Sequence, residues 1–419
     1  MEDIVARYKA STPTSSKMMA RSAEVIAGGV SRNFGYHIPY PVVNARGFGA
    51  HLEDVDGNVY IDTAYNGLSL IHGHASPEIL REIESTLGGG WAWPGSSRAQ
   101  IDFAEALLKR IPGYDKVRFT NSGTEAMMLA VKIARRATRR PLVMKARAAY
   151  HGSYPDLEAG LHGTGSIEGR TIVRDFGDTE GFVEAIGQNR DKLAAVLIEP
   201  VLVTGAIVPP PEGFLEAITE AARANDVLVI LDDCLMFRLA PAGSLEFFDI
   251  EADLVVLGKF IGGGVPMGAV LGPDSVMRVL SDPDQPLYHG GSFNGNLLAC
   301  RAGIKSLEML SPSSIDRMNA QAAEIKRFLQ SNNTLQTYNP TITGVGSVVG
   351  ISFNESEADA KDYLTTLNRN LRFHLSCLLS GVQMGAGGIV SLATAFDEAT
   401  VDDLKTRLDG AIQLFSETA

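Results

Sequence analysis

Hydrophobic residues in the middle of the chain alternate between short continuous runs and helical spacing. Two of the runs are Val227–Leu231 and Leu254–Leu257, and others lie at 117–119, 142–144, 195–198 and 269–271. Apolar residues spaced three and four apart predict helices at 77–87, 99–110, 124–137 and 213–224. Short apolar runs are typical of strands buried on both faces, and their alternation with helices indicates a parallel sheet. The pattern therefore predicts an α/β fold with a mostly parallel central sheet.

The pattern changes after about residue 311. Helical spacing at 314–329, 358–379 and 398–415 alternates with strand-like segments at 345–353 and 389–392. The first seventy residues contain strand-like His51–Glu53 and Val59–Ile61 around a turn. We therefore expect a large domain at 71–310 and a smaller α+β domain at 311–419, with an N-terminal segment, 1–70, packing on the smaller domain.

Composition narrows the class of protein. The 419 residues are 45% hydrophobic and 21% charged, as in ordinary folded proteins, and the net charge of −12 argues against a general nucleic-acid binder. The three cysteines match no metal-ligand spacing, so we predict no metal site and a reducing compartment. Neither a secretory signal nor a long apolar span is evident, which predicts a cytoplasmic protein without membrane contact.

Two charged residues follow neighbouring apolar runs. Asp232 ends the run 227–231, and Lys259 comes just after 254–257 and before a Gly-rich turn. An acid and an amine at strand ends suit pyridoxal phosphate, whose aldehyde forms a Schiff base with lysine and whose ring nitrogen is held protonated by a carboxylate. On these two residues alone, a capping aspartate and a solvated surface lysine are equally good interpretations.

Three further segments carry candidate chemistry. Ser122, Gly123 and Thr124 form a polar turn at a predicted helix start, which could bind an anion but, taken alone, is more typical of simple N-capping. Tyr150 follows the strand-like run 142–144 and could stack on a flat ring or merely pack. Ser292 belongs to a Gly-rich polar loop that is either a second phosphate contact or an ordinary loop.

The order of these segments resembles that of fold type I pyridoxal-phosphate enzymes, and within them the class III aminotransferases. The matching motifs are Asn121-Ser122-Gly123-Thr124-Glu125-Ala126, Tyr150-His151-Gly152, Ile198-Glu199-Pro200, Asp232 and Gly258-Lys259. The resemblance extends from about residue 28 to the C-terminus. It implies pyridoxal 5'-phosphate as cofactor and a homodimer with shared active sites.

The resemblance also implies residue roles. Lys259 would form the Schiff base and shuttle a proton, Asp232 would keep the ring nitrogen protonated, and Tyr150 would cover the ring. The predicted cofactor-binding set is completed by Ser122, Gly123, Thr124, His151, Glu199, Cys234 and Ser292. Ser292 stands where the family usually has a threonine that reaches the neighbouring subunit's phosphate.

The chain departs from the family pattern after the ring-nitrogen acid. The family reads Asp-Glu-Val or Asp-Glu-Ile there, whereas this chain has Asp232-Asp233-Cys234. Asp233 is one methylene shorter than glutamate, which implies different hydrogen-bond partners. Cys234 would lie against the ring face opposite Tyr150, as a packing residue rather than a redox group.

The motif sequences most resemble those of the β-phenylalanine-type transaminases and the glutamate-1-semialdehyde aminomutases. Gly28-Gly29-Val30-Ser31-Arg32 resembles the segment that supplies a carboxylate-binding arginine in the first group, although Arg32 could equally be a surface residue. The segment 383–388 lacks the second arginine of those enzymes. Aromatic residues could line an apolar pocket or belong to the core or a dimer interface: Phe34, Tyr36, Trp91 and Trp93.

The activity expected from this resemblance is an aminotransferase that moves an amino group between a small-molecule donor and an oxo acid by two half-reactions. A β-amino acid or a hydrophobic amine is the expected donor. An aminomutase is the nearest alternative, and a lyase or decarboxylase, with Asp233 and Cys234 redirecting the electrons, is another. A requirement for a separate oxo acid distinguishes the first two.

Overall fold

The computed structural model describes residues 1–161, 169–204, 206–353, 368–385 and 387–418. The chain divides into two compact units. The terminal unit consists mainly of Met1–Ser76 and Asp316–Ala419, and the central unit of Pro77–Thr204 and Pro209–Ile315.

The central unit is built on a seven-stranded sheet of order β4-β10-β9-β8-β7-β5-β6. Its strands are β4 (Lys116–Thr120), β5 (Leu142–Ala146), β6 (Thr171–Arg174), β7 (Leu193–Ile198), β8 (Leu228–Asp232), β9 (Leu254–Leu257) and β10 (Gly268–Gly272). Strands β6, β5, β7, β8 and β9 are parallel, whereas β10 is antiparallel to both its neighbours. The predicted α/β fold with a mostly parallel sheet is confirmed, and β6 was not predicted.

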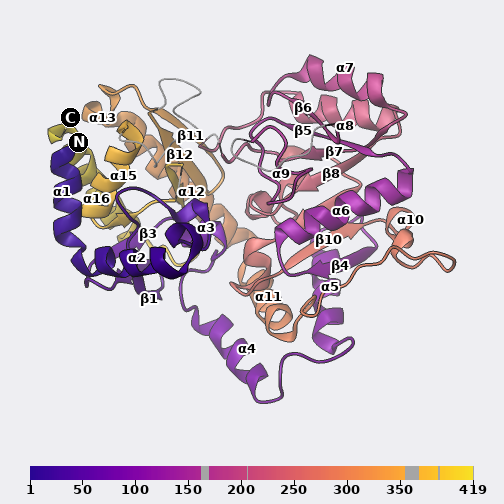
Figure 1. The fold of residues 1–419 in the computed structure, drawn as a ribbon, viewed down its shortest axis with the longest axis horizontal. Helices are drawn as coiled ribbons and strands as arrows, with labels where there is room; N and C mark the ends of the chain where they lie inside the picture. The colour runs from indigo at the N-terminus through magenta and orange to yellow at the C-terminus, as the bar shows by residue number, and fades with distance from the viewer. Residues whose placement is uncertain (162–168, 205, 354–367, 386, 419) are drawn as a thin grey trace. The chain divides into compact units, whose positions relative to one another are not determined.

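The helices of the central unit are α4 (Pro77–Leu87), α5 (Arg98–Arg110), α6 (Gly123–Thr138), α7 (Thr179–Asn189), α8 (Phe214–Ala224), α9 (Ser244–Phe248), α10 (Asp274–Met277) and α11 (Leu297–Met309). Helices α5, α6 and α8 pack against strands of the sheet, whereas α4 packs on α11 (Figure 1). Helix α6 shows why the predictions at 77–87, 99–110, 124–137 and 213–224 succeeded. Its residues at helical spacing are buried in the core beneath it: Ala126, Leu129, Ala130, Ile133 and Ala134.

The terminal unit contains two small sheets, of order β1-β2-β3-β13 and β11-β12-β14. Their strands are β1 (Asn44–Phe48), β2 (His51–Asp54), β3 (Val59–Asp62), β11 (Thr341–Val345), β12 (Val348–Ser352), β13 (Val382–Gln383) and β14 (Ile389–Ser391). Its helices are α1 (Glu2–Ser11), α2 (Pro13–Val25), α3 (Tyr65–Leu68), α12 (Pro312–Ser331), α13 (Asn333–Gln336), α15 (Arg369–Leu379) and α16 (Glu398–Glu417).

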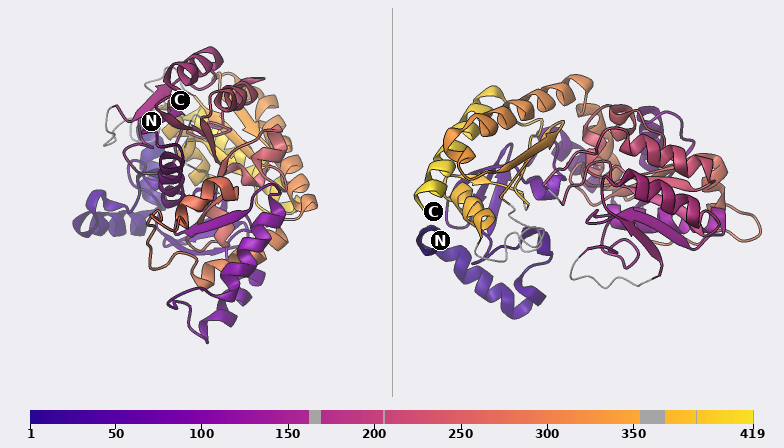
Figure 2. Two further views of the ribbon diagram at one scale, coloured as in Figure 1. Left: turned by 90° about the vertical axis from the view of Figure 1, so that its right-hand side faces the viewer. Right: turned by 90° about the horizontal axis from the view of Figure 1, so that it is seen from above.

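Both chain ends lie side by side in the terminal unit, where the Met1 amino group donates to Thr418 O over 3.4 Å (Figures 1 and 2). The strand predicted at 345–353 is confirmed as β12. Its antiparallel partner β11 was not predicted, and a turn at Gly346, whose φ of 55° favours glycine, joins the two strands. Of the helix predicted at 358–379, the part before residue 368 falls outside the described residues, and α15 forms the rest. Among the described helices, none is long and apolar enough to cross a membrane.

Candidate active site

Asp232 and Lys259 stand at the ends of two adjacent parallel strands. Asp232 is the last residue of β8 and lies opposite Val256 of β9. Lys259 begins a 3-10 turn, Lys259–Gly262, two residues after β9 ends. Ligands of such sheets bind at the carboxyl ends of the strands, so both side chains are at the edge where a cofactor is expected.

The Asp232 carboxylate is buried and held by two hydrogen bonds. His151 Nδ1 lies 2.9 Å from its Oδ2, and the backbone N–H of Cys234 donates to Oδ1 over 3.2 Å. Burial alone would raise the pKa of Asp232, but the His151 hydrogen bond and the positive charge of Lys259 outweigh it and hold that pKa below the ordinary value. Burial lowers the pKa of His151, which makes it a neutral donor. The site therefore holds a buried negative charge.

Tyr150 and Glu199 meet beside this carboxylate. The Tyr150 backbone N–H donates to Glu199 Oε2 over 3.2 Å, and the Tyr150 side chain is 47% exposed. Glu199 directly follows β7. Burial and the nearby charge of Asp232 raise the pKa of Glu199 to about 8. At neutral pH, Glu199 is thus a mostly protonated acid next to an ionised one.

The polar turn before α6 caps the helix and also leaves N–H donors available to an anion. Ser122 is the N-cap, because its Oγ accepts from the Glu125 N–H over 3.1 Å. The Asn121 N–H donates back to Glu125 Oε2 over 2.8 Å. The N–H groups of Gly123 and Thr124 have no partner within the helix, so a capped helix start still offers donors to an anion.

Four segments of the site approach one another at three glycines. A Cβ atom on Gly123 would lie 2.7 Å from Cys234 Sγ, and one on Gly258 would lie 3.0 Å from that sulfur and 3.1 Å from Gly123 Cα. A Cβ on Gly152 would lie 2.4 Å from Thr124 Oγ1. Glycine at these positions lets the polar turn, the Cys234 segment, the Lys259 turn and the Tyr150 segment pack together.

The structure gives Asp233 and Cys234 separate packing roles. Asp233 Oδ2 accepts the Ser244 N–H over 3.0 Å, and its Oδ1 accepts the Ser244 hydroxyl over 2.5 Å. The short carboxylate thus binds the first residue of α9, and burial raises its pKa to about 7. Burial also raises the pKa of Cys234 well above its ordinary value, so the sulfur is a neutral thiol.

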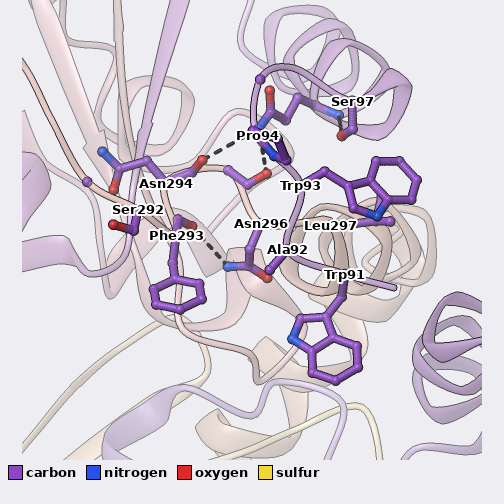
Figure 3. A pocket seen from close by; sticks show the side chains of 14 residues that line it. Trp91, Ala92, Trp93, Pro94, Ser97, Ser292, Phe293, Asn294, Asn296 and Leu297 are labelled. Carbon is purple, nitrogen blue, oxygen red and sulfur yellow. Dashed lines mark hydrogen bonds between the residues drawn. The ribbon is translucent and has the colours of Figure 1, made fainter. Parts of the chain in front are cut away.

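Ser292 lies on an exposed loop of the central unit. This loop lines a cavity of about 200 Å³ opposite Trp91 and Trp93 (Figure 3). The loop is tied to the polar turn through a hydrogen bond from Asn121 Nδ2 to Asn294 Oδ1, 2.8 Å long. Of the predicted site residues, the central unit therefore contains all but Arg32.

Arg32 belongs to the terminal unit, where it is exposed and donates from Nη2 to Asn66 Oδ1. Its predicted role in substrate binding stays a prediction.

Sequence reasoning missed Lys145, a fully buried lysine of β5 that donates from Nζ to Ala159 O over 2.7 Å. A lysine directly after the apolar run 142–144 was the signal. Burial lowers the pKa of Lys145 to about 8.

The arrangement suits the three chemical groups of pyridoxal phosphate. An ionised, buried Asp232 matches a protonated ring nitrogen, Lys259 supplies an amine for the aldehyde, and the start of α6 supplies N–H donors for the phosphate. The fold and the site define a fold type I pyridoxal-phosphate transferase.

Comparisons with known proteins give the same class. The family model "Aminotransferase class-III" matches residues 34–159 and 176–389. A glutamate-1-semialdehyde 2,1-aminomutase of Methanobrevibacter smithii is 32% identical over 88% of this chain and 90% of its own. The solved omega-transaminase from Sphaerobacter thermophilus is 31% identical with a TM-score of 0.87, covering 96% of this chain and 97% of its own. The β-phenylalanine aminotransferase from Variovorax paradoxus is 27% identical with a TM-score of 0.86, covering 97% and 95%.

The chain belongs to the class III aminotransferase family. The predicted cofactor, pyridoxal 5'-phosphate, is confirmed by the family and by a solved transaminase with this cofactor bound, which is 31% identical to the chain.

Proposed function

We propose that this protein is an aminotransferase that moves an amino group from an amino acid or amine to an oxo acid in two half-reactions. A hydrophobic β-amino acid is the proposed donor. The observation that carries the proposal is the buried, ionised Asp232 beside the lysine turn, at adjacent strand ends. The names of the Sphaerobacter and Variovorax relatives support it.

Asp232 and Lys259 would have separate roles in the reaction. When bound, the cofactor withdraws electrons from the substrate carbon that bears nitrogen. Asp232 would keep a proton on the ring nitrogen, because its low pKa favours the ionised carboxylate that pairs with a cation. Lys259 would remove the proton from the substrate carbon and return one later in the cycle.

Other groups would hold the cofactor. Ser122, Gly123 and Thr124 would bind the phosphate at the start of α6, and Tyr150 would cover the ring. His151 would act on the ring indirectly, by orienting Asp232 through their 2.9 Å hydrogen bond.

An aminomutase is the second candidate. It is favoured by the aminomutase relatives, of which that from Methanobrevibacter smithii is 32% identical. In such an enzyme, donor and acceptor are one molecule, so no separate oxo acid is consumed.

A homodimer with shared sites is part of the proposal. Ser292 is exposed, and Trp91, Trp93 and Phe293 around the same cavity are 47%, 53% and 58% exposed. Clustered exposed aromatic residues are typical of protein interfaces. A monomer at micromolar concentration in sedimentation of the cofactor-loaded protein would overturn this part.

The deciding experiment is an absorbance titration of the cofactor-loaded protein with 3-amino-3-phenylpropanoate, then with α-amino acids. We expect the visible band to fall as a near-ultraviolet band rises, and an added oxo acid to reverse the change. Lys259→Ala should show neither the original visible band nor the conversion. Turnover of glutamate-1-semialdehyde without an oxo acid would instead establish the aminomutase, and release of ammonia or carbon dioxide would establish a lyase or decarboxylase.

A further inference from the structure

Four consecutive residues of the terminal unit adopt left-handed backbone conformations. Their φ angles are 42° at Tyr65, 55° at Asn66, 70° at Gly67 and 64° at Leu68, which together form the short turn α3. Left-handed conformations are unfavourable for residues other than glycine, and a run of them persists only where the surroundings impose it. Such strain is concentrated at functional sites, which makes this turn worth explaining.

The turn is fixed at its start by a buried acid. Asp62 Oδ1 accepts the N–H groups of Ala64 and Tyr65 over 2.7 and 3.0 Å. Asp62 Oδ2 pairs with His74 Nε2 over 2.7 Å. These contacts hold the backbone that leads into Asn66, so the position of the Asn66 side chain is set by the buried part of the unit.

The Asn66 amide is itself held on its nitrogen side. Its Nδ2 donates to Ser69 Oγ over 2.9 Å, and Ser69 Oγ donates to Asn66 O over 3.0 Å. With the amide nitrogen engaged by Ser69, the amide oxygen points to Arg32, whose Nη2 donates to it over 2.5 Å. Asparagine tolerates the left-handed conformation better than most residues, so it suits a position that needs both this backbone and an amide.

The partner of Arg32 is therefore neutral. Within the described residues, no carboxylate forms an ion pair with Arg32. A guanidinium held by an amide keeps its full charge, and four of its five N–H donors remain for other acceptors. A carboxylate ligand accepts two such donors in a bidentate pair. Phe34 lies over Gly67, where an added Cβ would be 3.5 Å from the ring, and provides an apolar surface next to the same turn.

We propose that Asn66 is a positioning residue that presents Arg32 to the carboxylate of a hydrophobic acid. This inference rests on the proposed function and on the predicted role of Arg32 in binding the substrate carboxylate. Asn66 orients the guanidinium without neutralising it, and the left-handed turn exists to place its amide oxygen. The carboxylate-bearing substrate is thereby distinguished from an amine that lacks the acid group.

The test uses a ligand that binds without reacting, so that it does not depend on turnover. Calorimetry of the cofactor-loaded protein measures binding of 3-phenylpropanoate and of the uncharged 3-phenylpropanamide. The variants are Asn66→Gly, which keeps the left-handed backbone and removes the amide, and Asn66→Asp, which keeps the acceptor and adds a negative charge. Asn339 provides matched controls, because it is also exposed and left-handed, with φ 52°.

The wild type should bind the acid more tightly than the amide. Loss of one orienting hydrogen bond should weaken acid binding roughly three- to tenfold in Asn66→Gly. Asn66→Asp should weaken it by more than about tenfold, because its carboxylate competes for Arg32. Binding of the amide should change little in either variant, and Asn339→Gly and Asn339→Asp should match the wild type.

The Gly variant separates positioning from a structural role. Glycine keeps the left-handed turn, so if Asn66 only stabilised the turn, Asn66→Gly would bind the acid as well as the wild type, which would overturn the proposal. It is also overturned if the wild type does not prefer the acid to the amide. The absorbance titration with amino donors reports separately on amino transfer, so a protein that binds the acid through Asn66 but accepts no amino donor would refute the proposed function alone.

Discussion

The contact between His151 and Asp232 allows a quantitative prediction. Replacing His151 with Phe keeps a ring of similar size and removes the donor to Asp232 Oδ2, now 2.9 Å away. The other ring nitrogen of His151, Nε2, is buried without a hydrogen-bond partner in the described structure. The substitution therefore removes one good hydrogen bond and one unsatisfied polar atom together.

The size of the effect follows from these two changes. A hydrogen bond to a charged group contributes about 1.5–3 kcal/mol, and 1.36 kcal/mol corresponds to about one pKa unit. The pKa of Asp232 should thus rise by about 1–2 units in His151→Phe. Relief of the buried Nε2 recovers about 1–3 kcal/mol, so the free energy of unfolding at pH 8 should change by less than about 2 kcal/mol.

The sign of the pH dependence is determined by the depressed pKa of Asp232. A carboxyl group whose pKa is lowered by folding stabilises the fold above its unfolded value, and this contribution disappears as the pH falls through the folded value. In His151→Phe the folded value is higher, so the contribution disappears at a higher pH. The ionised form of Asp232, which is proposed to pair with the cofactor's ring nitrogen, is lost over the same range.

The assay is cofactor retention after gel filtration between about pH 3 and 8, read from the visible absorbance, because the low pKa of Asp232 places the wild-type limb near the acidic end of this range. The acidic limb of the retention curve should move upward by about 1–2 units in His151→Phe. Asp232→Asn, which has no charge to lose, should retain little cofactor and show no such limb. If the acidic limbs of the two retention curves, wild type and His151→Phe, coincide, this hydrogen bond does not control the ionisation of Asp232.

Two further substitutions test the interior of the central unit. Lys145→Met should raise the free energy of unfolding of the cofactor-free protein by about 1–3 kcal/mol at pH 7, since the buried ammonium, with its pKa lowered to about 8, is costly below that pH. Urea unfolding should show this gain disappear by pH 10, and a less stable variant at pH 7 would contradict it. Gly258→Ala should abolish cofactor retention, because its Cβ would lie 3.0 Å from Cys234 Sγ. Gly187→Ala in α7, where a Cβ meets nothing within 4 Å, is the matched control and should retain the cofactor.

The positions of the main site residues could be predicted because the ends of buried strands can be located in the sequence. Buried strands appear as continuous apolar runs, so the residues that follow them, Asp232 and Lys259, are placed once the runs are recognised. The sheet topology then makes β8 and β9 neighbours. The start of α6 could also be located, because Ser122 is a typical N-cap residue and apolar residues at helical spacing follow it.

The contacts between segments could not be predicted in this way. Nothing in the local sequence of His151 indicates that its ring reaches Asp232, 81 residues away. The pairing of Arg32 with Asn66 likewise depends on a left-handed turn, and no residue type specifies four left-handed residues in succession. Both contacts depend on tertiary packing, which local patterns do not encode.

The departure from the family pattern at Asp233 and Cys234 illustrates how tertiary packing decides the meaning of a substitution. Read from the sequence, an extra acid and a thiol beside Asp232 invited the idea that they redirect the chemistry towards a lyase. In the fold, both oxygens of Asp233 are engaged by Ser244, and the Cys234 sulfur is a neutral thiol packed near Gly123 and Gly258. Burial keeps the Cys234 thiol neutral, and the Asp233 carboxyl, whose pKa burial raises to about 7, has both oxygens engaged by Ser244. Packing therefore accounts for the two residues on which the lyase alternative rested, and the proposed reaction rests on Asp232 and Lys259.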